Sequence, residues 1–237
     1  MNLTALERSD LTQLREAFAV HGCVSIGRFL PDDEASALAG SLAQRQDWVE
    51  VFQGRDQAYD MAAGAFEALD PAQKRQLDEL VWQQAARGFQ FRFRSIRVPD
   101  AREQRVPSQD ELHAFAEFMC SEPVMDHLRL ITACDDIAFA DAQATAYSAG
   151  HFLTAHDDDV AGKGRRAAYV FSLTENWSAD WGGLLVFPQG EELTGFLPAF
   201  NCLRIFRVPQ PHSVTFVPPF VSQTRYSITG WLRTAPS

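Results

Sequence analysis

The chain has 237 residues, enough for one large domain with its own core, so we expect a single domain spanning 1–237. Acidic residues number 31 against 21 Lys and Arg, and the net charge of −10 disfavours nucleic acid or an anionic membrane as a partner. The start of the chain lacks a basic region followed by an apolar run, and no segment approaches the roughly 18 apolar residues of a membrane helix, so we expect a cytoplasmic protein. The four cysteines form no Cys-x-x-Cys pair, which predicts reduced thiols.

Helices dominate the expected structure of residues 1–140. Residues 23–26 form a short strand between the first two helices. Capping and stop signals predict five helices, marked by Ser9 or Asp10 with Gly22, by Leu30–Glu34, by Asp70–Pro71 with Gly88, by a capping box in Ser108–Glu111, and by Ser121 with Pro123.

Two stretches of this half each have two interpretations. The segment Asp47–Asp60 carries Trp48, Phe52 and Tyr59, and it is either a lid over a substrate or an ordinary surface connection. The segment Arg87–Arg105 contains six arginines in an acidic protein. They either meet an acidic peptide or form the solvent face of a half-buried strand in which phenylalanines alternate with them.

Short β-rich runs separated by Gly, Pro and Asn fill residues 141–237. They lie at 144–147, 152–155, 167–173, 184–187, 202–206, 213–217 and 226–232. Strands at this spacing without intervening helices predict a closed barrel or jelly roll, and the N-terminal helices would pack on one outer face of it. The predicted fold class is therefore mixed α and β, with a jelly-roll core in the C-terminal half.

The run His156–Asp159 is the first candidate site. In an extended strand residues i and i+2 share a face, so His156 and Asp158 could bind one cation, with Asp157 and Asp159 pointing outward. A second histidine, His212, would come from a distant strand. Two imidazoles and one carboxylate leave open coordination positions, which is typical of non-heme Fe(II) oxygenases. The alternative is a solvated acidic turn before Gly162 and Gly164.

Five motifs follow one another in the second half, namely Tyr147–Asp158, Arg165–Tyr169, Trp181–Phe187, Pro211–Val214 and Arg225–Trp231. Over roughly residues 141–233 this pattern resembles the 2-oxoglutarate- and Fe(II)-dependent dioxygenases of the prolyl-4-hydroxylase type. Within them it is similar to the prolyl hydroxylases that modify a ribosomal protein and to their bacterial relatives. The family's core is a double-stranded β-helix, which agrees with the predicted jelly roll.

The resemblance implies a role for each matching residue. His156, Asp158 and His212 are the expected iron ligands. Arg225 stands where the family binds the distal carboxylate of 2-oxoglutarate, and its planar guanidinium suits that task. Further cosubstrate contacts are expected from Ser227, from Tyr147, and from Ser172, which replaces a tyrosine common in the family; Trp231 shares the strand face of Arg225.

The implied activity is hydroxylation of an unactivated C–H bond, with Fe(II), 2-oxoglutarate and O₂ as cofactor and cosubstrates and ascorbate as a candidate addition. The expected substrate is a prolyl residue in a protein or peptide, and the alternative is a free amino acid or small metabolite. The carboxylate of Asp158 favours hydroxylation, because related halogenases lack it. No oligomeric state is predicted.

Other classes of function remain open. A noncatalytic sensor that binds iron and 2-oxoglutarate would keep the same residues. A nucleic-acid demethylase of this superfamily would carry a second arginine where this chain has Trp231, and a zinc hydrolase would need a general base beside the triad. His21, His113 and His127 are expected on helices, and strand parity turns His151 away from the site.

Overall fold

The computed structural model of the protein describes residues 1, 8–54 and 56–235. Within these residues it contains five α-helices, α1 (Arg8–His21), α2 (Asp32–Gln44), α3 (Pro71–Ala85), α4 (Glu111–Met119) and α5 (Glu122–Thr132), and two short 3-10 turns, Arg102–Gln104 and Ala179–Trp181. The strands are β1 (Cys23–Gly27), β2 (Val49–Gln53), β3 (Ala58–Met61), β4 (Phe91–Arg97), β5 (Ile137–Ala140), β6 (Gln143–Tyr147), β7 (Phe152–His156), β8 (Arg165–Ser172), β9 (Leu185–Gln189), β10 (Glu192–Phe196), β11 (Cys202–Arg207), β12 (His212–Val214) and β13 (Arg225–Thr234).

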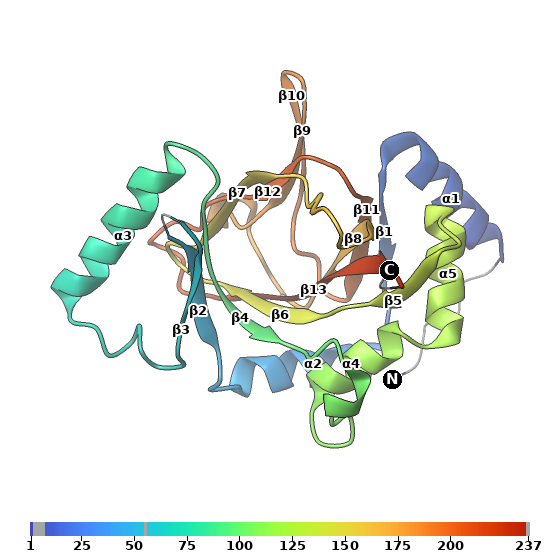
Figure 1. Cartoon of the computed structure of the whole chain (residues 1–237), viewed down its shortest axis with the longest axis horizontal. Coiled ribbons are helices and arrows are strands. Elements are labelled where there is room, and N and C mark those ends of the chain that lie inside the picture. Colours follow the sequence, from blue (N-terminus) through green and yellow to red (C-terminus); the bar gives the residue numbers. More distant parts are fainter. Residues whose placement is uncertain (2–7, 55, 236–237) are drawn as a thin grey trace.

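The strands form one antiparallel sheet that curls over on itself. Its order is β1-β11-β8-β13-β6-β4-β7-β12-β9-β10, with β2 and β3 continuing from β4 and β5 pairing with β13. In Figure 1 the strands β7 and β12 lie above β6 and β13, and residues of all four strands line one enclosed space. This arrangement confirms the predicted jelly-roll core with helices added to it.

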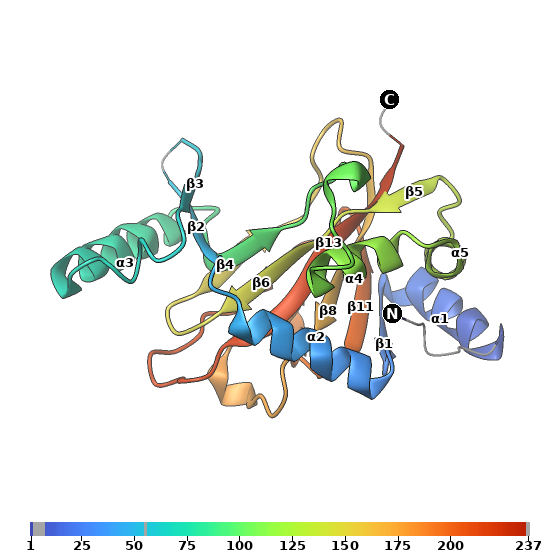
Figure 2. The same cartoon turned by 90° about the horizontal axis from the view of Figure 1, so that it is seen from below.

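Helices cover one face of the larger part of the sheet. Figure 2 shows α2 and α4 lying across β8, β11 and β13, with α1 and α5 at one end. The main core fills this layer, where Leu38 of α2 and Phe115 of α4 share a buried cluster with Phe171, Leu203 and Ile228 of the strands. Because side chains alternate along a strand, the residues between these apolar positions point to the opposite, enclosed face of the sheet.

The helix starts differ in part from the prediction. Asp70 caps α3 as expected, since its Oδ1 accepts hydrogen bonds from the N–H groups of Ala72 and Gln73. The predicted capping box at Ser108 is wrong, because Asp110 caps α4 by accepting from the N–H groups two and three residues later. The predicted cap at Ser9 or Asp10 is also wrong, because α1 already begins at Arg8. Residues 2–7 lie outside the described part of the chain.

The segment 47–60 is a hairpin rather than a loop. Its strands β2 and β3 pair with each other, and β2 also pairs with β4, so the hairpin extends the sheet beside the enclosed space. Stacking of Phe52 on Tyr59, with ring centroids 5.8 Å apart, supports the hairpin. Whether it acts as a lid stays a prediction.

Both interpretations of the arginine-rich segment are wrong for its two most buried members. Arg92 is 2 % exposed and forms ion pairs with Glu50 and Asp78, while Arg105 is 6 % exposed and pairs with Glu117. Phe89, in contrast, is 49 % exposed. Arg92 ties β4 to β2 and α3, and Arg105 ties the segment after β4 to α4, so both hold the fold together instead of facing solvent or a peptide.

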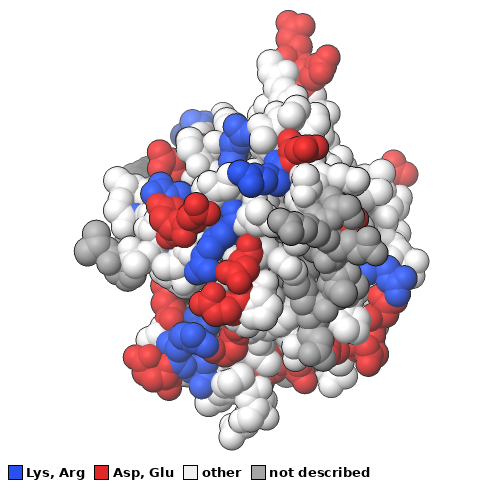
Figure 3. Space-filling model, turned by 90° about the vertical axis from the view of Figure 1, so that its right-hand side faces the viewer, with Lys and Arg blue, Asp and Glu red and all other residues white. Residues whose placement is uncertain are grey.

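Charges of both signs lie close together on the surface around α1 and α5. Figure 3 shows acidic and basic side chains side by side on that face. Among the described residues, no helix combines the length and the apolar composition needed to cross a bilayer.

Glu50→Gln is expected to lower the free energy of unfolding by about 3 kcal/mol at pH 7. The folded protein lowers the pKa of the Glu50 carboxyl, and each unit of such a shift corresponds to about 1.4 kcal/mol of stability. Burial tends to raise the pKa of Glu50, but interactions with His151 and then Arg92 outweigh it and lower the pKa from 4.5 to about 2. The folded pKa lies below the unfolded one, so this stabilisation is present above pH 4.5 and disappears as the pH falls toward 2.

Urea unfolding of the wild type and of Glu50→Gln at pH 7 and pH 3.5 measures this effect. The difference between the two proteins should shrink at the lower pH, while the exposed Glu192→Gln gives no such change. A difference that stays constant with pH would contradict the assignment of the depressed pKa to Glu50.

Candidate functional site

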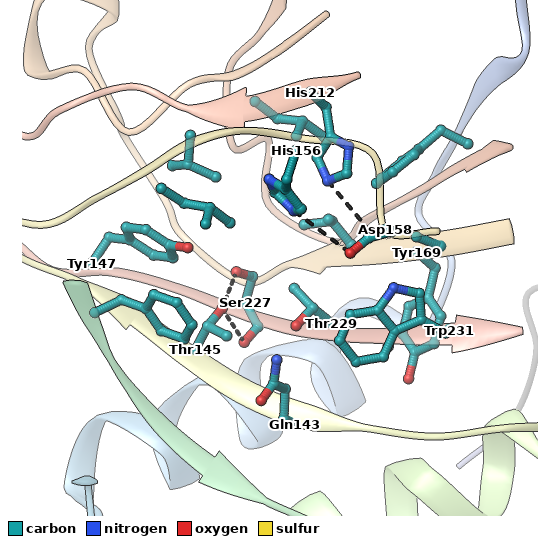
Figure 4. A pocket seen from close by; sticks show the side chains of 18 of the residues that line it. Gln143, Thr145, Tyr147, His156, Asp158, Tyr169, His212, Ser227, Thr229 and Trp231 are labelled. Atoms are coloured by element: carbon teal, nitrogen blue, oxygen red, sulfur yellow. Dashed lines mark hydrogen bonds and ion pairs between the residues drawn. The ribbon is translucent and has the colours of Figure 1, made fainter. Parts of the chain in front are cut away.

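His156, Asp158 and His212 converge at the edge of the enclosed space. His156 ends β7 and is the direct partner of His212 at the start of β12. The Oδ1 of Asp158 lies 3.5 Å from Nε2 of His156, and its Oδ2 lies 3.4 Å from Nε2 of His212. One ligand atom from each residue lies within 4.8 Å of the others (Figure 4). This spacing allows all three side chains to bind one metal ion.

The backbone fixes which nitrogen each histidine offers. Nδ1 of His156 donates to the carbonyl of Thr154 at 3.0 Å, and Nδ1 of His212 donates to the carbonyl of Gln210 at 2.8 Å. Each Nε2 is therefore the lone-pair nitrogen and faces Asp158. Burial, followed by repulsion from His156, lowers the pKa of His212, which favours its neutral, metal-binding form.

Asp158 reaches the two histidines through a turn and not through strand alternation. Strand β7 ends at His156, and Asp158 adopts a left-handed backbone conformation with φ of 65°. The prediction that both residues share a strand face is therefore wrong, although their side chains do meet. Arg165 holds the turn by donating to the backbone carbonyl of Asp158 at 3.0 Å. Asp157 and Asp159 are exposed, as the sequence predicted.

A pocket of about 540 Å³, including its mouth, extends from the triad into the jelly roll. Its floor consists of facing residues of β6 and β13, which pair as Tyr147 with Arg225, Thr145 with Ser227, and Gln143 with Thr229. The hydroxyls of Thr145 and Ser227 are 2.9 Å apart (Figure 4). The floor is thus polar, whereas the walls include apolar residues such as Leu185 and Val214.

Arg225 is a buried cation without a counterion. It is 2 % exposed, forms no ion pair among the described residues, and its Nε and Nη1 have no hydrogen-bond partner there. Burial lowers its pKa to about 10, so it stays charged at neutral pH. The ring of Tyr147 lies 5.2 Å from the guanidinium, and burial raises the pKa of its phenol. A buried, unpaired guanidinium is costly, and an anionic ligand would remove that cost.

Ser172 is less well placed for the role expected of it. It lies opposite Ser227 in the pairing of β8 with β13 and is buried. It does not line the pocket, unlike Ser227 and Tyr147. The structure therefore brings the other predicted site residues together around one pocket and leaves Ser172 beside it.

A wider groove continues outward from the triad. It is lined by Phe89, Phe91 and Phe93, whose rings contact one another in turn, and by Arg165 and Trp231. The guanidinium carbon of Arg165 lies 3.5 Å from the centre of the Trp231 ring. Nε of Arg165 and Nε1 of Trp231 are buried and have no partner among the described residues. The groove thus combines aromatic surface with unused hydrogen-bond donors.

Sequence reasoning missed two residues of this region. The motif Arg165–Tyr169 by itself indicates no role for Arg165, although the position of Arg165 shortly after the triad aspartate places it near the turn. Gln143 was overlooked, although it has the same strand parity as Thr145 and Tyr147. His151 binds Glu50 at 3.1 Å outside the triad, and the remaining histidines lie on helices α1, α4 and α5, as predicted.

Comparison with known proteins agrees with this geometry. Residues 142–233, fewer than half of the chain, match the family model of the 2OG-Fe(II) oxygenase superfamily. No curated relative matches the sequence.

Solved structures with the same fold include a Pseudomonas putida prolyl-4-hydroxylase, with a TM-score of 0.61, 22 % identity, and coverage of 94 % of this chain and 98 % of that one. A Burkholderia pseudomallei oxidoreductase of the 2OG-Fe(II) oxygenase family has a TM-score of 0.61 and 14 % identity, and the match covers 98 % of this chain and 96 % of that one. A Trichoplax adhaerens prolyl hydroxylase in complex with a hypoxia inducible factor peptide fragment has a TM-score of 0.57 and 17 % identity, and the match covers 97 % of this chain and 94 % of that one. These likenesses establish the fold, and the site-bearing segment 142–233 is similar in sequence to the 2OG-Fe(II) oxygenase superfamily.

Proposed function

We propose that the protein is an Fe(II)- and 2-oxoglutarate-dependent oxygenase that hydroxylates an unactivated C–H bond, with a prolyl residue of a protein or peptide as the preferred substrate. The observation that carries this proposal is the presence of a His-Asp-His triad and a buried, uncompensated Arg225 in one pocket. The triad suits a metal ion, and the arginine suits the distal carboxylate of a small dicarboxylate.

Each residue has a defined task in this proposal. His156, Asp158 and His212 hold Fe(II), and their Nδ1 hydrogen bonds keep both imidazoles oriented toward it. Arg225 and Ser227 bind the distal carboxylate of 2-oxoglutarate, and Thr145 orients the Ser227 hydroxyl. When bound, Fe(II) and 2-oxoglutarate supply the oxidising chemistry that uses O₂ and releases succinate and carbon dioxide. The apolar pocket walls exclude water from the reacting atoms.

The groove supports a protein or peptide substrate. It is open and lined by aromatic side chains that suit an apolar ring, and the β2–β3 hairpin stands beside it. One structure with this fold contains a bound peptide fragment. We also propose that residues 1–237 form one catalytic domain, because helices α2 and α4 share their core with strands of the jelly roll.

Active protein is expected to add one oxygen atom to a specific proline of a cellular peptide, and mass spectrometry of a treated extract measures this. The protein, Fe(II), 2-oxoglutarate and ascorbate are added to the extract, with His156→Ala as the matched control. Peptides that gain an oxygen only with the wild type support the proposal.

Two other outcomes would contradict it in different ways. An oxygen gained only by a free amino acid or another small metabolite would overturn the peptide substrate while keeping the oxygenase. A protein that binds iron and 2-oxoglutarate but oxidises nothing in the extract would favour a sensor.

A further inference from the structure

Gln143 occupies the junction between the inner pocket and the outer groove. It is the first residue of β6 and the direct partner of Thr229 on β13. Its side chain lines both spaces, which makes it a neighbour of any cosubstrate in the pocket and of any substrate in the groove. Figure 4 shows it across the pocket from the triad. In the proposed function, the carbon to be oxidised would lie between these two sides.

Ser95 fixes the direction in which the Gln143 amide points. Ser95 is 2 % exposed, and its hydroxyl donates to Oε1 of Gln143 at 3.2 Å. This contact uses the amide oxygen and turns the NH₂ group toward the pocket, as Figure 4 shows. Nε2 forms no hydrogen bond with the described residues. A donor that is oriented by one neighbour and unused by the others is suited to a ligand.

The charges around this junction select the kind of acceptor that Nε2 would meet. Three arginines line the groove together with Lys163, and each arginine already pairs with an aspartate: Arg97 with Asp60, Arg165 with Asp158, and Arg233 with Asp100 and Asp141. A free carboxylate would have to compete with these aspartates for the arginines, whereas a neutral carbonyl oxygen needs only one uncharged donor. The amide of Gln143 is itself neutral and matches a neutral acceptor.

We propose that Gln143, oriented by Ser95, is a specificity-determining residue whose Nε2 donates a hydrogen bond to a neutral carbonyl oxygen next to the carbon that is oxidised. The inference rests on the proposed function and deepens it. The hydrogen bond from Gln143 would favour a substrate in which that carbonyl belongs to an amide, as in a peptide. It would disfavour a free amino acid, which has a carboxylate in the same place.

Three pyrrolidine compounds test the inference by binding. N-acetyl-L-proline N-methylamide carries the neutral carbonyl, N-acetyl-L-proline carries a carboxylate there, and N-acetylpyrrolidine carries neither. Dissociation constants are measured by NMR titration of the protein loaded with Zn(II), a redox-inert replacement for Fe(II), and 2-oxoglutarate. The wild type is expected to bind the methylamide about 3- to 10-fold more tightly than each of the other two.

Variants separate hydrogen bonding from structure. Gln143→Leu should bring the dissociation constants of the methylamide and N-acetylpyrrolidine to the same value, and Ser95→Ala should reduce their ratio part of the way. Gln143→Glu should disfavour the methylamide, because it replaces the donor by an acceptor. The affinity for 2-oxoglutarate is measured for each variant, and the titrations are made at saturating 2-oxoglutarate so that the ratios compare binding of the pyrrolidine compounds alone.

The possible outcomes keep this inference apart from the proposed function. A Gln143→Leu variant that weakens both compounds equally, or that keeps the wild-type ratio, overturns the inference. So does a wild type that binds 2-oxoglutarate but shows no preference for the methylamide or binds none of the compounds. A wild type that fails to bind 2-oxoglutarate would instead overturn the proposed function.

Discussion

Asp158→Ala is expected to abolish the iron-dependent conversion of 2-oxoglutarate to succinate, with a loss of more than about 100-fold, since even outer partners of metal ligands contribute about 10- to 100-fold. Its two oxygens lie 3.5 and 3.4 Å from the Nε2 atoms of His156 and His212, so it is the carboxylate that completes the set. Two neutral imidazoles alone offer a divalent ion neither a third ligand nor a negative charge.

Succinate release by purified protein with added Fe(II) measures this loss, and a Co(II) titration reports metal binding separately. Asp159→Ala is the matched control, because Asp159 is an exposed carboxylate one position further along the same turn. It should retain turnover and metal affinity. Equal losses in both variants would indicate damage to the turn, and retained turnover in Asp158→Ala would remove Asp158 from the metal site.

The triad illustrates how far sequence reasoning reaches. The residue types and their order predicted which side chains would meet, because the metal chemistry restricts the set to histidine and carboxylate. The route by which they meet was not predicted. The chain leaves β7 at His156 and passes through a left-handed residue, Asp158, and hydrophobic periodicity carries no information about a single residue of that kind.

The buried ion pairs show a second limit of sequence reasoning. The alternation of Arg92 with phenylalanines predicted a solvated arginine face. Its partners Glu50 and Asp78 are 42 and 14 residues away in the sequence, and nothing local to β4 identifies them. A buried charge depends on partners from several elements, so its position follows from the tertiary fold and not from the strand pattern. The overall jelly roll was predictable because it depends on many repeated local signals.

Arg225→Met is expected to have opposite effects on the protein with and without 2-oxoglutarate. The affinity for 2-oxoglutarate should fall by roughly 10- to 150-fold, the range of a charge-assisted hydrogen bond to a buried carboxylate. The free energy of unfolding in the absence of 2-oxoglutarate should rise by about 1–2 kcal/mol, because methionine replaces a charge whose Nε and Nη1 have no partner among the described residues.

Urea unfolding with and without 2-oxoglutarate measures both effects in one experiment. Arg225→Lys keeps a positive charge and should retain part of the stabilisation by 2-oxoglutarate, but it cannot offer two parallel donors. Arg204→Met is the matched control, because Arg204 is another buried arginine of the jelly roll, 7 % exposed and bonded to Ser25. It should leave the response to 2-oxoglutarate unchanged. If Arg225→Met lowers stability and keeps that response, Arg225 is a structural residue and the distal carboxylate binds elsewhere.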